Sequence, residues 1–229
     1  MNRFKRSLFS FWTWFKNLLK QEKIDNNLTE IPPKAYKSRA EILDGINENY
    51  FSPYRIFIKS GSELTDDEIL NHLGIKDYKL ETEKPDWKSR YLFLSENDGW
   101  VHLMDDWSYS LWHNKTIRNN IQSLSQRFEI FTCSIGDIDN SFDFTYLKNG
   151  EIIRQYIAED PNFKKLVIVK NIGKPFPIET EALKLKDTAK KVTMIAKHLG
   201  LNLNYTKDQM RVYKLMNKAA EKFNFDYPY

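Results

Sequence analysis

Hydrophobic and polar residues repeat with the period of an α-helix in the first twenty positions of the chain. When residues 1–20 are placed on a helix at about 100° per residue, one face is apolar and aromatic and the other is basic and polar. The apolar face carries Phe4, Leu8, Phe11, Trp12, Trp14, Phe15, Leu18 and Leu19, and the polar face carries Arg3, Lys5, Arg6, Ser10, Thr13, Lys16, Asn17 and Lys20. The pattern predicts a basic amphipathic helix within residues 1–24.

Such a helix has several uses, and the sequence disfavours two of them. A transmembrane span needs roughly 20 apolar residues, and Lys16 interrupts this run. A secretory signal needs a small-residue cleavage pattern, which does not follow Leu19. We expect the helix to lie in an anionic membrane surface, at the inner membrane face, with docking on the protein's own body or on a partner protein as alternatives. The predicted membrane-interface residues are Phe4, Leu8, Phe11, Trp12, Trp14, Phe15 and Leu18 on the apolar face, and Lys5, Arg6 and Lys16 on the basic face.

Polar residues around Pro32-Pro33 predict a linker over residues 25–34, followed by one domain over 35–229. This domain starts with a predicted short helix at 35–48. Thr65 and Glu68 have the spacing of a capping box, so a short helix begins there and ends at Gly74. Alternating apolar residues predict strands at 54–59, 77–83, 90–95 and 100–104, with turns at Pro85-Asp86 and Asn97-Asp98-Gly99.

The middle of the chain contains the clearest hairpin. A helix is predicted over 108–126 and an apolar strand over 128–135. Two alternating segments then flank Asn149-Gly150, a dipeptide typical of a two-residue type I′ turn. A regular ladder through this turn would place Phe142 opposite Ile157 and Tyr146 opposite Ile153, which pairs apolar residues on one face.

The last third of the chain is predicted to combine one strand with two helices. Residues 166–169 are apolar on both faces, which indicates a central strand, and Pro175 and Pro177 end the sheet region. Helices are predicted over 180–199 and 206–223, the second with Thr206 as its N-cap. The fold class is therefore α+β: a mainly antiparallel sheet with a mid-chain helix and two C-terminal helices, preceded by the N-terminal amphipathic helix.

The net charge of +4 is concentrated at the N-terminus. Residues 1–23 hold six basic residues and one acidic residue, a balance of +5, so the remaining residues sum to −1. The body of the protein therefore lacks the basic surface expected for nucleic-acid binding. The single cysteine, Cys133, lies in an apolar strand and is expected to be a buried thiol in a reducing compartment, which favours a cytoplasmic location.

The sequence contains no catalytic or metal-binding motif. The four histidines are not spaced as metal ligands, and no zinc signature, phosphate loop or nucleophile elbow is present. Residues 137–143 imitate the start of a calcium loop, but Phe142 replaces the required glycine and Lys148 the required glutamate. We therefore predict a non-enzymatic protein without metal or cofactor. The alternative is an enzyme with a dispersed site around His102, Asp105 and His113.

Aromatic residues cluster between Trp87 and Trp112 and indicate either core packing or a binding surface. Those flanked by polar residues are the better candidates for a surface, and neighbouring acidic residues would complete it. The predicted partner-binding residues are Asp105, Asp106, Trp107, Tyr109, Trp112, Asp137 and Asp139.

The segment from Gly99 to Gly200 also has a recognisable order of motifs. It runs through Gly99-Trp100-Val101, Phe128-Glu129-Ile130-Phe131, Asp137-Ile138-Asp139-Asn140-Ser141-Phe142, Tyr146-Leu147-Lys148-Asn149-Gly150-Glu151 with Arg154, Gly173-Lys174-Pro175-Phe176-Pro177-Ile178-Glu179 and His198-Leu199-Gly200. This order resembles small bacterial α+β proteins, some associated with polymorphic-toxin loci and similar to immunity proteins. The resemblance covers under half of the chain and does not include the N-terminal helix. It implies a protein that occludes a toxin domain and has no catalytic residues.

These observations support three hypotheses of function. The first is a non-enzymatic protein-binding protein, of the toxin-neutralising immunity type. The second is a membrane-peripheral scaffold or accessory protein, in which the helix within residues 1–24 is the functional element. The third is the enzyme with a dispersed His and Asp site.

Overall fold

The computed structural model describes residues 54–60, 64–82, 89–105, 111, 115–136, 139–160, 165–203 and 210–216. The chain divides into two compact units, Met1–Lys37 and Ser38–Tyr229, and every described residue belongs to the second. The predictions for residues 1–24, 25–34 and 35–48 therefore lie outside the described residues.

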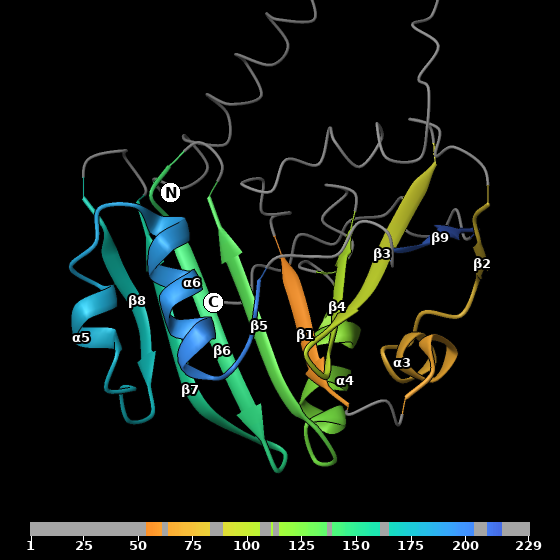
Figure 1. Ribbon diagram of the computed structural model, residues 1–229, viewed down its shortest axis with the longest axis horizontal. Coiled ribbons are helices and arrows are strands. Elements are labelled where there is room, and N and C mark those ends of the chain that lie inside the picture. The colour runs from red at the N-terminus through yellow and green to blue at the C-terminus, as the bar shows by residue number, and fades with distance from the viewer. Residues whose placement is uncertain are drawn as a thin grey trace, which may run out of the picture. The chain divides into compact units, whose positions relative to one another are not determined.

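The described residues form an antiparallel sheet of nine strands in the order β2-β9-β3-β4-β1-β5-β6-β7-β8 (Figure 1). Every neighbouring pair runs antiparallel. The predicted α+β class with an antiparallel sheet is confirmed. The strands are β1 (Arg55–Lys59), β2 (Tyr78–Leu80), β3 (Arg90–Asn97), β4 (Trp100–Asp105), β5 (Glu129–Ile135), β6 (Phe142–Lys148), β7 (Glu151–Glu159), β8 (Val167–Ile172) and β9 (Arg211–Leu215).

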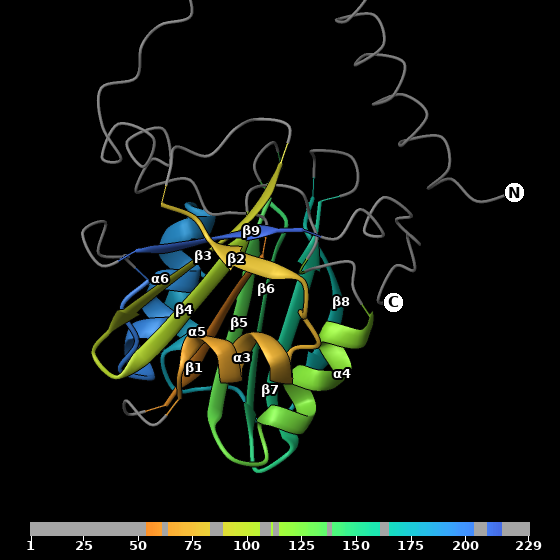
Figure 2. The same cartoon turned by 90° about the vertical axis from the view of Figure 1, so that its right-hand side faces the viewer.

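Helices cover both faces of this sheet, as Figure 2 shows from the side. Helices α3 (Asp66–His72) and α4 (Lys115–Leu124) pack on one face, and α5 (Glu179–Ala182) and α6 (Thr188–His198) pack on the other. Strand β1 shows how alternation divides the core, because Ile56 belongs to the cluster under α3 and α4 and Phe57 to the cluster under α6. The predicted capping box of α3 is confirmed, since Thr65 Oγ1 accepts from the Glu68 amide and Glu68 Oε2 accepts from the Thr65 amide.

The turn of the β6–β7 hairpin is the predicted one, but the register beyond it is not. Asn149 and Gly150 have φ of 54° and 78°, as a type I′ turn requires, and Leu147 pairs with Ile152. The next pair is Tyr146 with Arg154, so Ile153 is the extra residue of a β-bulge. The predicted pairs of Phe142 with Ile157 and Tyr146 with Ile153 are therefore wrong by one residue. Phe142 instead pairs with Ala158.

The strand predicted at 166–169 exists, but its central position is wrong. Among the described strands, β8 is the last of the sheet and pairs only with β7. Its apolar residues face solvent on both sides of the sheet, so an apolar pattern that is typical of a buried strand here belongs to an edge.

The second predicted C-terminal helix is wrong over Arg211–Leu215, which form strand β9 between β2 and β3. Val212 and Tyr213 point to opposite faces of the sheet and join different apolar clusters. The helix predicted over 180–199 is present as α5 and α6, separated by a short turn. The mid-chain helix is described from Lys115 to Leu124 as α4.

Candidate functional site

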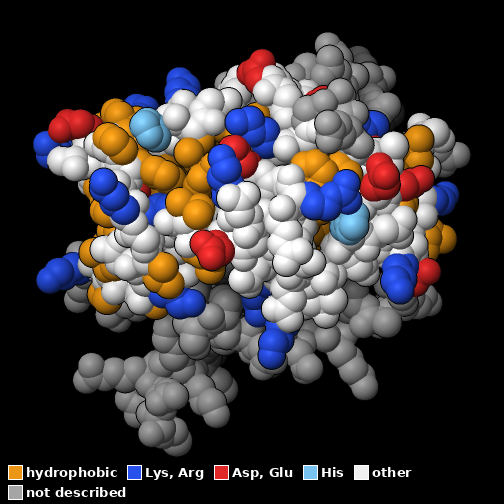
Figure 3. Space-filling view, turned by 90° about the horizontal axis from the view of Figure 1, so that it is seen from below, with side chains coloured by type: hydrophobic (Ala, Val, Ile, Leu, Met, Phe, Trp, Pro, Cys, Tyr) orange, Lys and Arg blue, Asp and Glu red, His pale blue; other side chains and the backbone are white. Residues whose placement is uncertain are grey.

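The β7–β8 end of the sheet carries most of the exposed apolar surface of the described residues. Nine large hydrophobic side chains are exposed among the described residues, and six of them lie on these two strands. We call these six residues the edge patch: Ile152, Ile153, Val167, Ile168, Val169 and Ile172. Figure 3 shows hydrophobic side chains gathered on the side of β7, β8 and α5, with Lys and Arg side chains around them. Clustering of apolar side chains, unlike single exposed ones, is typical of an interaction surface.

Two bulges shape this edge. On β7 the extra residue is Ile153, and on β8 it is Val169, because the register passes from Ile157–Lys170 to Ala158–Ile168. A bulge adds a residue to one strand only, which turns the following side chains to the other face. The edge patch therefore combines β-branched side chains from both faces of the sheet.

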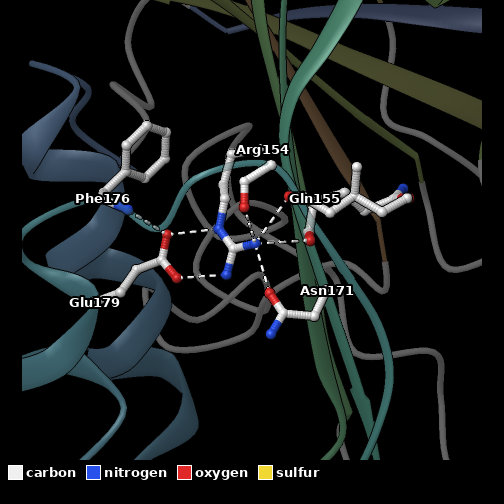
Figure 4. Close-up of polar contacts among 7 residues, drawn as sticks. Arg154, Gln155, Asn171, Phe176 and Glu179 are labelled. Atoms are coloured by element: carbon white, nitrogen blue, oxygen red, sulfur yellow. Dashed lines mark hydrogen bonds and ion pairs between the residues drawn. The ribbon is translucent and has the colours of Figure 1, made fainter.

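A buried ion pair holds β7 against α5 just behind the edge patch (Figure 4). Arg154 Nε donates to Glu179 Oε1 at 2.8 Å, and Arg154 Nη2 donates to Glu179 Oε2 at 2.6 Å. The two side chains are 1% and 2% exposed. This bidentate geometry is the strongest form of an arginine–carboxylate contact. Because the bulge at Ile153 shifts the register, Arg154 lies opposite Tyr146 on the face covered by α6.

The same guanidinium also binds β8. Its Nη1 donates to Asn171 Oδ1 at 2.7 Å and to the Ile172 carbonyl oxygen at 2.8 Å. Glu179 Oε1 in turn accepts from the Phe176 amide at 2.8 Å, which fixes the turn before α5. One buried arginine therefore joins β7, β8 and α5, and the edge strand is held on a rigid support.

The turn that leaves β8 depends on Gly173. Its φ is +80°, a conformation that glycine adopts without strain. A Cβ built on Gly173 would lie 2.0 Å from the carbonyl oxygen of Ile153, far inside van der Waals contact. Glycine is thus required for the chain to pass close to the β7 bulge and reach α5.

The segment that forms β8 is rich in lysine. Residues 165–174 hold three lysines and no acidic residue. Residues 165–203, which form β8, α5 and α6, hold eight lysines and three acidic residues, a net charge of +5. One of those acids, Glu179, is neutralised by Arg154. The lysines of this segment are partly balanced by acids on the neighbouring strand, since Glu159 of β7 pairs with Val167 of β8. The absence of a basic surface for nucleic-acid binding therefore stays a prediction.

The face covered by α3 and α4 contains a buried polar cluster on β5, β6 and β7. Asp143 accepts a hydrogen bond from Ser134 Oγ, and Gln155 Nε2 donates to Thr145 Oγ1 at 3.1 Å. Burial raises the pKa of Asp143 to about 7, and the bond from Ser134 opposes part of that rise. A carboxyl that titrates near neutrality suits acid–base chemistry, but Asp143 is only 7% exposed and its described partner is a serine of the same sheet. We interpret the cluster as a structural network that destabilises the fold as pH rises, because Asp143 then loses its proton while buried.

The other titratable groups considered from the sequence are buried in the core. Burial raises the pKa of the Cys133 thiol to about 12, so the thiol is unreactive at neutral pH. His102 stacks on Phe57 with ring centroids 4.3 Å apart. Burial, and then the charge of Arg55, hold the His102 pKa well below its ordinary value. His102 and Asp105 are three residues apart on β4 and so lie on opposite faces of the sheet, which separates two members of the dispersed site. His113 lies outside the described residues.

The predicted partner-binding residues are only partly described, and one of them is not on the surface. Asp105 is 2% exposed, and its Oδ2 accepts from the Leu111 amide at 3.1 Å. Asp105 therefore binds the backbone at Leu111 and is buried, so its predicted place on a binding surface is wrong. Asp139 is half-buried and accepts from the Ser141 amide at 2.8 Å. Asp106, Trp107, Tyr109, Trp112 and Asp137 lie outside the described residues.

Sequence reasoning missed the edge patch, although two signals pointed to it. Lys170 interrupts the apolar run 166–172, and a glycine and a proline follow at 173 and 175. Charged residues inside a strand and Gly or Pro directly after it are typical of edge strands.

Comparison of this chain with protein-family models, with curated proteins and with solved structures found no significant match. Within the described ranges, no three His, Cys, Asp or Glu side chains are grouped in a way that could hold a metal ion. In the same part of the chain, no helix has both the length and the apolar composition of a membrane span.

Proposed function

We propose that this chain is a non-enzymatic protein-binding protein and that its partner docks on the edge patch. The observation that carries the proposal is the exposed, β-branched edge strand β8, supported from behind by the ion pair of Arg154 and Glu179. Exposed apolar area costs free energy in water, about 25 cal/mol per Å², so a partner that covers it gains that amount on binding. The immunity-type function implied by the resemblance is one form of this proposal, with a toxin domain as the partner.

A site-specific crosslinker tests where the partner docks. Ile168 on β8 and Leu80 on β2 are 55% and 54% exposed, at opposite ends of the sheet, so they form a matched pair. The photoreactive residue p-benzoylphenylalanine is placed at one position or the other in the full chain, and the chain is crosslinked in its native cells. We expect one discrete protein to be crosslinked from position 168 and not from position 80. Equal crosslinking from both positions contradicts the proposal.

Binding of the crosslinked protein, once identified and purified, is then measured directly. Ile168→Lys places a charge in the centre of the edge patch, and Leu80→Lys makes the same change at the other edge. We expect Ile168→Lys to weaken binding by at least about tenfold, a loss typical of an interface hot spot, and Leu80→Lys to leave it unchanged. If Ile168→Lys binds as tightly as the native chain, the edge patch is not the binding site.

A second proposal concerns the cellular location, and the amphipathic pattern of residues 1–24 supports it. We propose that this segment holds the protein at an anionic inner membrane face, which would also suit a scaffold or accessory protein. The full chain is sedimented with vesicles that contain anionic lipid, and is compared with a variant in which Lys5, Arg6 and Lys16 are replaced by Gln. We expect binding of the native chain to exceed that of the variant at low salt and the difference to shrink as salt rises. No binding of the native chain at low salt would contradict a membrane location.

A further inference from the structure

We propose that the partner contributes an extended, acidic segment that pairs with β8 and adds a strand to the sheet. This inference rests on the proposed function, since it concerns the same edge patch, and it specifies how the partner binds and what its chemistry is. It follows from three properties of β8: its outer side, with which no described strand pairs, its charge and its rigid support.

The first property is the open backbone of β8. Alternate residues of a strand direct their N–H and C=O groups to opposite sides, and β8 uses one side to pair with β7. Among the described residues, no strand pairs with its other side. Such an edge is a template for strand addition, in which main-chain hydrogen bonds provide affinity and the side chains of alternate residues provide specificity. Ile168 and Val167 lie on opposite faces of β8, so they would contact both faces of an added strand.

The second property is the charge of the edge. Lys165 and Lys174 flank β8 and are exposed, and Lys170 lies within it. Because residues 165–174 hold three lysines and no acidic residue, a second β8 from another copy of this chain would bring like charges together. An extended segment with Glu or Asp beside β-branched residues would instead match both the lysines and the apolar side chains. The charge therefore favours an acidic segment of a different protein over self-association through β8.

The third property is the support of β8. Arg154 binds Asn171 and the Ile172 carbonyl oxygen on β8, and it is itself fixed by Glu179. A strand held in this way loses little conformational freedom when another strand pairs with it. Most of the ordering cost on binding would fall on the partner segment.

Synthetic peptides test the charge of the partner segment. The probe is the capped nonapeptide Glu-Val-Glu-Val-Thr-Val-Glu-Val-Glu, and its counterpart has Lys in place of every Glu. Binding to the full chain is followed by NMR from the backbone amides of β8. We expect the Glu peptide to bind at least about tenfold more tightly at low salt and its advantage to fall at high salt. The inference is overturned if the Lys peptide binds equally well, or if neither peptide shifts the β8 amides.

A charge-reversed variant provides the matched control. Replacing Lys165 and Lys174 with Glu leaves the β-branched residues in place, so strand addition remains available while the charge preference should invert. We expect this double variant to prefer the Lys peptide. An unchanged preference for the Glu peptide would mean that the edge lysines do not select the partner.

Backbone N-methylation distinguishes strand addition from contact through side chains alone. Two versions of the Glu peptide carry N-methyl groups on either the odd or the even residues, because alternate N–H groups face β8 in an added strand. We expect one version to lose binding and the other to retain it. If both bind like the parent peptide, strand addition is wrong.

Docking on the edge patch and strand addition can be refuted separately. When Ile168→Lys weakens binding of the crosslinked partner but both N-methylated peptides bind alike, the proposed function stands and strand addition is refuted. When the crosslinked partner tolerates Ile168→Lys, the proposed function itself is refuted. A native chain that is dimeric in solution and becomes monomeric on Ile168→Lys would show that a second copy occupies β8, which also overturns the acidic partner.

Discussion

Strands β2 and β8 form the two edges of one sheet, yet they present different surfaces. Strand β2 has three residues, and Tyr78 donates from its hydroxyl to Asp67 Oδ1 at 2.8 Å. Residues 64–82 around it hold two lysines and five acidic residues, a net charge of −3. Strand β8 has six residues, is apolar on both faces and lies in a segment of charge +5. A very short edge strand resists pairing with other chains, whereas the longer, apolar β8 offers them a template.

An arginine–carboxylate pair lies toward each end of the sheet, and the two pairs differ in burial. At the β2 end, Arg211 and Asp66 are 36% and 14% exposed, and Tyr213 also donates to Asp66 Oδ2 at 2.6 Å. The hydrogen bond with Asp66 raises the pKa of Arg211. At the β8 end, Arg154 and Glu179 are almost fully buried. Water can replace a lost partner at the first pair but not at the second, so the β8 edge depends far more on its ion pair.

The largest expected effect comes from breaking the two pairs in turn. Glu179→Ala leaves the Arg154 charge buried without its carboxylate, and we expect a loss of about 3–5 kcal/mol of unfolding free energy. Asp66→Ala should cost about 1 kcal/mol, because Arg211 remains in contact with water. Urea unfolding of both variants measures the difference. Equal losses would show that burial does not separate the pairs.

The second prediction uses pH to compare the buried carboxyl of Asp143 on β6 with a neutral substitute. The folded-state pKa of Asp143 is raised to about 7 from an ordinary 3.8, so the folded protein favours the protonated form. The contribution of the protonated Asp143 to the free energy of unfolding is fully present below pH about 4 and is lost as pH rises through about 7. The total loss is at most about 4 kcal/mol. Asp143→Asn should match the native chain in stability near pH 4 and exceed it at pH 8. Parallel stability curves across that range would refute the raised pKa.

The third prediction compares two glycines with similar backbones. Gly173 and Gly99 have φ of +80° and +76°, but a Cβ at Gly99 would meet nothing within 4 Å. Gly99→Ala should therefore cost about 1 kcal/mol from backbone strain alone. Gly173→Ala should cost about 2–4 kcal/mol, because its Cβ also overlaps the Ile153 carbonyl oxygen. Thermal unfolding of the two variants checks this, and similar shifts in Tm would contradict the close approach of the chains.

The smallest expected effect is the change in unfolding free energy when a lysine is introduced on either edge strand. Ile168→Lys and Leu80→Lys both alter exposed side chains, so each should change the unfolding free energy by no more than about 0.5 kcal/mol. Their effects on partner binding should nevertheless differ as described above. A large stability loss for Ile168→Lys alone would show that this side chain is covered in the free protein.

Local sequence signals predicted much of the fold. The capping box at Thr65, the hairpin turn at Asn149-Gly150 and the strands on either side of it are formed as expected. Each of these features depends on residues close together in the chain, so the sequence pattern alone was sufficient.

Features that depend on distant contacts could not be predicted in this way. The bulge at Ile153 shifts the register and places Arg154 against Glu179, a contact across 25 positions. The apolar positions within Arg211–Leu215 suit a strand as well as a helix, and it is the pairing with β2 and β3 that makes this segment a strand. For β8, hydrophobicity correctly indicated a strand, but its place in the sheet follows from the order of all nine strands among the described residues.

The insertion of β9 between β2 and β3 has a consequence for biosynthesis. Strand β2 has β9 as its sole partner among the described strands, and the ribosome makes β9 after β8 and α6. While the chain is being synthesised, β3 therefore lacks its outer neighbour. Leu92 and Leu94 have no pairing partner on that side until β9 has been made. A nascent chain arrested before Arg211 would expose the outer edge of β3 and would be prone to aggregation. Synthesis of Arg211–Leu215 therefore protects the nascent protein, because β9 then covers this edge.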